Sequence, residues 1–145
     1  MINFAKIRAT LETFFNGNKP TGFPTIVWDT QTFEPTPGTP WVRFEIVEDS
    51  DERITLTGTP LVGQETTGIV VISYYQPQGL GWQTPDTMLH AAGQLFNEAR
   101  IPITDSCDYI EFDTVDRNEQ MVDDPWIQKQ ISFNFRIYEN QEATP

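Results

Sequence analysis

The stretch GIVVISYYQPQGLGWQTPDTML, residues 68–89, contains the strand, the turn and the helix start from which the fold can be worked out. Residues 69–75 are apolar on both faces, as expected of a strand in the middle of a sheet that is covered on both sides. Thr84-Pro85-Asp86 is a helix-start signature, in which Thr84 can cap the helix and Asp86 suits its positive end. A stripe at helical spacing then predicts a helix that ends at Pro102; its members are Met88, Leu89, Ala92, Leu95, Phe96 and Ala99.

Gly79-Leu80-Gly81 could be read either as a phosphate-binding loop or as a plain turn between strand and helix. A Walker loop needs Lys and Ser or Thr directly after its last glycine, and here Trp82-Gln83 follow. A dinucleotide fingerprint needs a third glycine at position 84, which is Thr. The glycines therefore predict a turn.

The N-terminal residues predict a first amphipathic helix over about 2–15, followed by Gly17 in the left-handed conformation after the helix end. A short strand at 26–28 and a Pro-rich surface loop at 29–40 come next. Residues 41–48 alternate between apolar and polar, so they predict a half-buried strand. Asp49 to Glu52 reads as a charged turn, with residues 53–57 as the returning strand of a hairpin and a Gly/Thr/Pro-rich stretch over 58–67.

Two further strands are expected at about 107–115 and 127–138, separated by a polar, acidic segment over 116–125. The order helix, strands, helix, strands predicts an α+β fold with a mainly antiparallel sheet and two helices packed on one face. We expect one domain over residues 1–145, with a frayed tail over about 140–145.

The composition excludes several classes of protein. Nine basic and 21 acidic residues give a net charge of −12, and the cations are scattered, so tight nucleic-acid binding is not expected. The N-terminus lacks the continuous apolar run of a signal peptide, and no stretch is apolar enough to span a membrane. Cys107 is the only cysteine, which fits a reducing compartment.

No catalytic, metal or cofactor site is predicted. His90, the only histidine, is interpreted as a partly buried structural residue, and Cys107 lacks a neighbour that would lower its pKa. The carboxylates at 49–52, at 105–116 and at 123–124 lack the calcium-loop pattern and are interpreted as solvated loop charge. A hydrolase with two carboxylates that meet in space, and a carbohydrate-binding module with exposed tryptophans, remain alternatives.

The tryptophans leave two interpretations open. Trp28, Trp41, Trp82 and Trp126 all lie at strand ends, loops or turns. They either anchor a protein interface or close the ends of the core.

A succession of segments resembles the tail terminator and minor tail proteins of long-tailed bacteriophages. The segments are IRATLETFF, PTIVWDTQTFEPTPGTPWVRFEIVEDS, ITLTG, TGIVVISYYQPQGLGW and DTMLHAAGQLFNEAR, and the resemblance covers about residues 2–100. It implies a non-enzymatic virion protein without cofactors. Six copies would form a ring on the head-proximal end of the tail tube and would contact the tube and a head-completion protein.

By the same analogy, the hairpin and loop over 48–66 would contact neighbouring subunits or the tube. The candidate interface residues are Arg43, Asp51, Arg53, Trp82 and Trp126. A head–tail connector of similar size is the nearest alternative.

Overall fold

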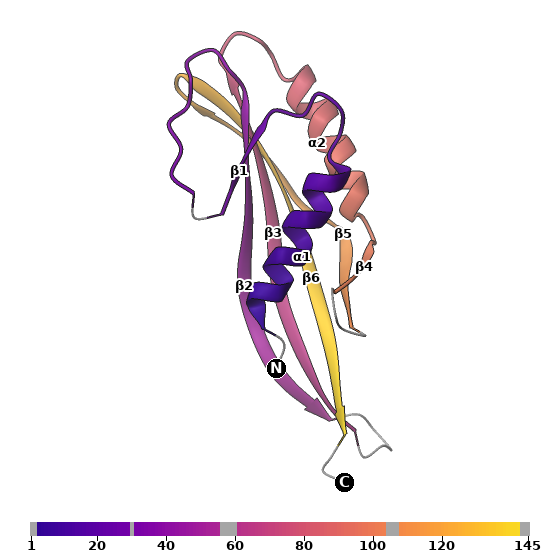
Figure 1. Ribbon diagram of the computed structural model, residues 1–145. Coiled ribbons are helices and arrows are strands. Elements are labelled where there is room, and N and C mark those ends of the chain that lie inside the picture. The colour runs from indigo at the N-terminus through magenta and orange to yellow at the C-terminus, as the bar shows by residue number, and fades with distance from the viewer. Residues whose placement is uncertain (1–2, 30, 56–60, 104–107, 143–145) are drawn as a thin grey trace.

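The computed structural model describes residues 3–29, 31–55, 61–103 and 108–142. The elements follow in the order α1 (Phe4–Asn18), β1 (Thr25–Trp28), β2 (Trp41–Thr55), β3 (Leu61–Pro77), α2 (Gln83–Phe96), β4 (Arg100–Pro102), β5 (Tyr109–Asp123) and β6 (Trp126–Glu142). Both helices lie on the same face of one long, twisted sheet (Figure 1). The expected α+β fold is confirmed.

The sheet has the strand order β1-β2-β3-β6-β5-β4. β3 and β6 pair antiparallel along their whole lengths, from Leu61↔Glu142 to Pro77↔Trp126. β2, β5 and β4 extend the sheet with further antiparallel pairs, and only the short β1 is parallel to its neighbour, over Thr25↔Trp41 to Trp28↔Phe44. The sheet is therefore mainly antiparallel, as expected.

An aromatic core joins the helices to the sheet. Phe15 of α1 stacks on Phe44 of β2 with ring centroids 5.0 Å apart. Phe96 of α2 contacts Phe112 at 5.1 Å and Phe133 at 5.5 Å. Each of these five rings is at most 4% exposed, and burying one such side chain stabilises the fold by roughly 1.5–3 kcal/mol.

The second helix begins two residues earlier than the signature at 84–86 predicted. α2 begins at Gln83 with Trp82 at the capping position and no side-chain cap, so the assignment of Thr84 as the cap is wrong. Gly79 and Gly81, at φ +92° and +78°, form the turn that the sequence predicted. α2 ends at Phe96 rather than at Pro102, because Glu98 adopts a φ of 54° and residues 100–102 form the edge strand β4.

Gly17 is another correction at a helix end. α1 continues through Asn18, and Gly17 is not among the glycines with positive φ. The Asn18 side chain donates to the Phe14 carbonyl at 2.8 Å, which satisfies one of the last acceptors of the helix.

The expected turn at 49–52 does not exist. β2 runs through it to Thr55, with a register shift between Glu48 and Ser50, and pairs with β3 down to Thr55↔Val62. β5 likewise continues through most of the polar segment over 116–125, and turns only at residues 124–125. Pairing of β6 reaches Glu142, which includes the first residues of the segment that was expected to fray.

Three strands project beyond the helices and form an extension that we name the arm, defined as residues 50–55, 61–67 and 136–142. Figure 1 shows β2, β3 and β6 continuing past the start of α1 toward the C-terminus. β5 pairs with β6 only as far as Glu111↔Arg136, and β1 pairs with β2 only at 41–44. Beyond Arg136, both outer edges of the arm are therefore unpaired among the described residues.

Candidate subunit and partner interfaces

The five predicted interface residues lie in three separate places. Trp82 and Trp126 are half-buried at the end of the sheet opposite the arm, at the start of α2 and of β6. Arg43 is half-buried on the sheet face that the helices leave uncovered. The backbones of Asp51 and Arg53 lie in the arm, opposite Thr66 and Gln64 of β3, and their side chains lie outside the described part of the structure.

The helix-free face carries an aromatic cluster that the sequence analysis did not identify. Trp41 stacks on Tyr75 at 4.0 Å, contacts Phe33 at 5.0 Å and meets Trp126 edge-on at 6.4 Å. The guanidinium of Arg43 lies 5.6 Å from the Trp41 ring. Trp41 occupies a polar position in the alternation of β2, and a tryptophan at such a position is the signal that could have revealed a contact on this face.

Trp41 is only 8% exposed, so it closes this end of the fold. Its indole Nε1 is buried and has no hydrogen-bond partner among the described residues. Trp28 also packs against the main core, next to Phe44. Of the four tryptophans, only Trp41 is buried, whereas Trp28, Trp82 and Trp126 are partly exposed; Trp41 and Trp28 fit the core-closing interpretation because of their contacts.

Next to Trp41, the helix-free face is polar but buried. Ser73, Gln128 and Ser132 are between 2% and 9% exposed. The Ser73 hydroxyl and the Gln128 amide both donate to Gln130 Oε1 at 3.4 Å. Without these hydrogen bonds, transfer of the polar atoms from water into the protein would destabilise the fold.

A charged network lies on the same face farther toward the arm. Arg136 Nη1 donates to Asp113 at 2.9 Å, and Glu111 lies between Arg136 at 3.7 Å and Arg100 at 3.6 Å. The hydrogen bond that Arg136 donates to Asp113 raises the pKa of Arg136 above its ordinary value. Glu111 and Asp113 are thus paired on a strand, so the interpretation of these two carboxylates as loop charge is wrong.

A second charged site joins α1 to the edge of the sheet. Arg8 contacts Asp29 at 2.5 Å, and the same Asp29 oxygen accepts the Ile46 backbone N–H of β2 at 3.2 Å. Burial raises the pKa of the nearby Glu12; Arg8 opposes this shift and Asp29 adds to it. The site connects α1, β1 and β2 through one carboxylate.

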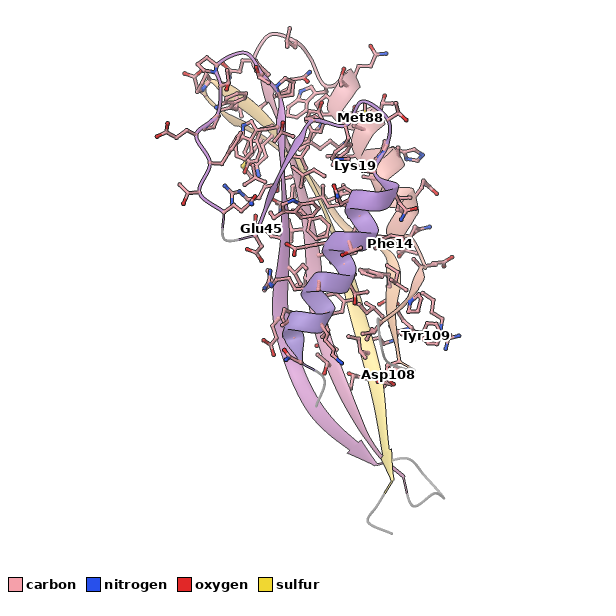
Figure 2. The ribbon with its side chains drawn as sticks, in the orientation of Figure 1. Phe14, Lys19, Glu45, Met88, Asp108 and Tyr109 are labelled. Carbon is pink, nitrogen blue, oxygen red and sulfur yellow. The ribbon has the colours of Figure 1, made fainter. Side chains whose placement is uncertain are left out.

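His90 is exposed on α2, so its assignment as a partly buried residue is wrong. It lines a shallow cavity of about 700 Å³ together with Leu89, Lys129 and Ile131. Lys129 forms an ion pair with Asp86 at one side of this cavity. Figure 2 labels Met88 of α2 and Lys19, which follows α1, on the helical side of the molecule.

The described residues contain no group of three or more His, Cys, Asp and Glu side chains arranged to hold a metal ion. Among the helices in the part of the chain that the structure describes, none combines the length and apolar character needed to cross a membrane. Cys107 lies outside the described residues.

Comparison with known proteins identifies the family. The model of the phage tail terminator protein family matches residues 6–135. No curated protein matches the chain. One solved structure superposes with a TM-score of 0.70 at 14% identity and covers 94% of this chain and 96% of its own, which supports the fold alone. From the family match, we conclude that the chain belongs to the phage tail terminator family, a structural rather than an enzymatic family, and that it is a virion component with a role in phage tail assembly.

Proposed function

We propose that this protein terminates the phage tail. Six copies form a ring on the head-proximal end of the tail tube, stop its polymerisation and provide the surface to which the head-completion protein binds. The observation that carries the proposal is the family match over residues 6–135, which includes both helices and most of the sheet. A head–tail connector is the second candidate.

The two sides of the sheet suit a ring in which each subunit contacts its neighbours head to tail. Such a ring joins two different surfaces of each subunit. One edge of the sheet carries β1 and the Arg8–Asp29 ion pair, whereas the other carries β4 and the Arg100–Glu111 pair. These unlike edges support a head-to-tail arrangement over a self-complementary dimer.

The arm supports a role in contacts outside the subunit. Beyond its base, where Thr66 and Ile137 are buried, the arm has no helix on either face in Figure 1 and, past Arg136, no strand at either outer edge within the described residues. A small sheet needs a packed face for stability, so contact with a neighbouring subunit or with the tube would stabilise it. Asp51 and Arg53 belong to the arm, and Arg53 is, together with Arg43 on the helix-free face, a candidate for an ion pair across the ring.

The charge of the protein fits a ring through which DNA passes. A net charge of −12 disfavours adhesion of the phosphate backbone to the protein. DNA would therefore move through the lumen without specific binding.

Deletion of this gene from the parent phage tests the proposal directly. Electron microscopy of the lysate should show overlong tails without heads, and the intact gene supplied in trans should restore tail length. Tails of normal length lying apart from filled heads would favour the connector. Intact infectious particles would contradict both roles.

The proposed stoichiometry needs a separate measurement. Native mass spectrometry of the purified protein, alone and with tail tubes, should give a species of six subunits. A different closed number would change the ring but leave the terminating role in place.

A further inference from the structure

The end of the sheet opposite the arm, which we name the turn end, consists of residues 77–82 and 121–126. Two turns lie side by side there, because Gln78 N–H donates to the Pro125 carbonyl at 3.0 Å and Pro77 pairs with Trp126. Figure 1 shows the β5–β6 turn and the β3–α2 connection at this same end.

The turn end exposes large apolar side chains. Leu80 is 63% exposed, Val122 64% and Met121 45%, and Trp82 and Trp126 are partly exposed beside them. Val122 and Leu80 are the most exposed of the large apolar residues described in the structure. Met121 and Val122 are consecutive in β5 and project to opposite faces, so the exposed apolar residues lie on both faces of this end. Exposed apolar and aromatic side chains mark protein contact sites.

The charge of the turn end differs from that of the arm. The turn end contains two aspartates, Asp123 and Asp124, and no basic residue. The arm contains five acidic residues and two arginines. Each molecule thus carries a mainly apolar end and a strongly charged end, separated by the length of β3.

We propose that the turn end is the docking surface for a protein of different sequence, whose contact patch is apolar at its centre and carries Lys or Arg at its rim. Basic residues at the rim would complement Asp124, which is exposed. Two turn ends of this chain placed together would instead bring four aspartates into one contact without a cation, within proteins of net charge −12 each. The charges therefore disfavour contact between two turn ends, and the absence of a cation at the turn end favours a partner that supplies basic residues. A second copy that presents another surface is distinguished from a different partner by native mass spectrometry.

This inference rests on the proposed function, because it assigns a surface to one of the two structures that a terminator joins. The test is complementation of the gene-deleted phage with Leu80→Glu, Val122→Glu and the double variant. Gln94→Glu serves as a control for the added negative charge, since Gln94 is exposed near the end of α2, away from the turn end. Thermal unfolding and native mass spectrometry of each purified variant report on folding and on self-assembly.

We expect the double variant to fold and to assemble as the wild type does, yet to lower the phage titre by at least about tenfold, the effect of losing one moderate hot spot. The Gln94→Glu control should leave the titre unchanged. Asp124→Lys should lower the titre more than Asp124→Asn, because it reverses the charge that faces the basic rim.

Two results would overturn the assignment of the turn end. Full complementation by the double variant would show that no partner needs this surface. Loss of the assembled species in native mass spectrometry, with the monomer still folded, would show that copies of this chain meet there. If Leu80→Glu lowers the melting temperature, its titre reflects misfolding, and the titre and assembly of Val122→Glu alone decide between these outcomes. Normal particles from the gene deletion would refute the proposed function itself, which separates that failure from a failure of the docking surface.

Discussion

Replacement of Gly68 by Ala tests how closely the sheet is packed. Gly68 lies in β3 on the helix-covered face, beneath the ring of Phe135. A Cβ atom at this position would lie 2.4 Å from Phe135 Cζ and 2.8 Å from the Val47 carbonyl oxygen. Gly68 does not have a positive φ, so space rather than backbone conformation excludes the side chain.

The expected loss of stability follows from two opposed effects. Alanine in a strand is favoured over glycine by roughly 0.5–1 kcal/mol because it loses less backbone entropy on folding. Overpacking costs about 1–3 kcal/mol, and here the ring can turn but the Val47 carbonyl belongs to the strand beside it. We expect a net destabilisation of about 1–2 kcal/mol, which corresponds to a fall in melting temperature of roughly 3–7 °C for a domain of this size.

Thermal and urea unfolding of Gly68→Ala, Phe135→Leu and the double variant measure this effect. Phe135→Leu removes the ring that blocks Cβ, so the double variant should be more stable than the sum of the single losses by about 0.5 kcal/mol or more. Gly17→Ala is the control, since a Cβ there meets nothing within 4 Å and lies within α1, where alanine is favoured. A Gly68→Ala protein as stable as the wild type, or an absence of coupling with Phe135→Leu, would refute the reasoning.

Three further changes test other parts of the structure. Phe96→Ala, which removes a fully buried ring from the contact between α2 and the sheet, should cost about 3–5 kcal/mol in urea unfolding, whereas a loss below 1 kcal/mol would contradict its central position. Burial raises the pKa of Glu12, so ionisation of this carboxyl destabilises the folded state as the pH rises. The melting temperature of Glu12→Gln should therefore exceed that of the wild type near pH 7. At about pH 3, where both side chains are neutral, the two melting temperatures should be equal. Arg53→Glu should lower the amount of assembled species in native mass spectrometry. Lys6→Glu, an equal charge reversal at an exposed position of α1, should leave that amount unchanged. Equal effects of the two variants would remove Arg53 from the ring contacts.

The spacing of apolar residues predicted the core, because every second residue of a half-buried strand has to face the interior. The alternation of β6 places Ile131, Phe133 and Phe135 against the helices, and all are at most 4% exposed. The glycine turn at 79–81 was predictable for the same local reason, since positive φ at two positions favours glycine. The two-helix α+β arrangement follows from these elements.

Other features depend on distant parts of the chain. The charged residues 49–52 are typical of a turn in sequence. In the structure no helix covers this part of the sheet, and pairing with β3 keeps the backbone extended. The N–H of Ile46 bonds to Asp29, which lies 17 residues earlier, and no local pattern indicates this contact. Of the interface residues, the partial exposure of Trp82 and Trp126 followed from their place at turns, and the position of Arg43 opposite the buried face followed from the alternation of β2.

The uninterrupted pairing of β3 has a mechanical consequence. β3 pairs with β6 along its whole length and with β2 along most of it, over roughly 56 Å. These hydrogen bonds lie perpendicular to the strands, so tension along the strands loads them together in shear, whereas tension across the sheet opens them one after another. The subunit is therefore stiff between the turn end and the arm and more compliant across its width, so a force applied at one end is transmitted to the other with little stretching.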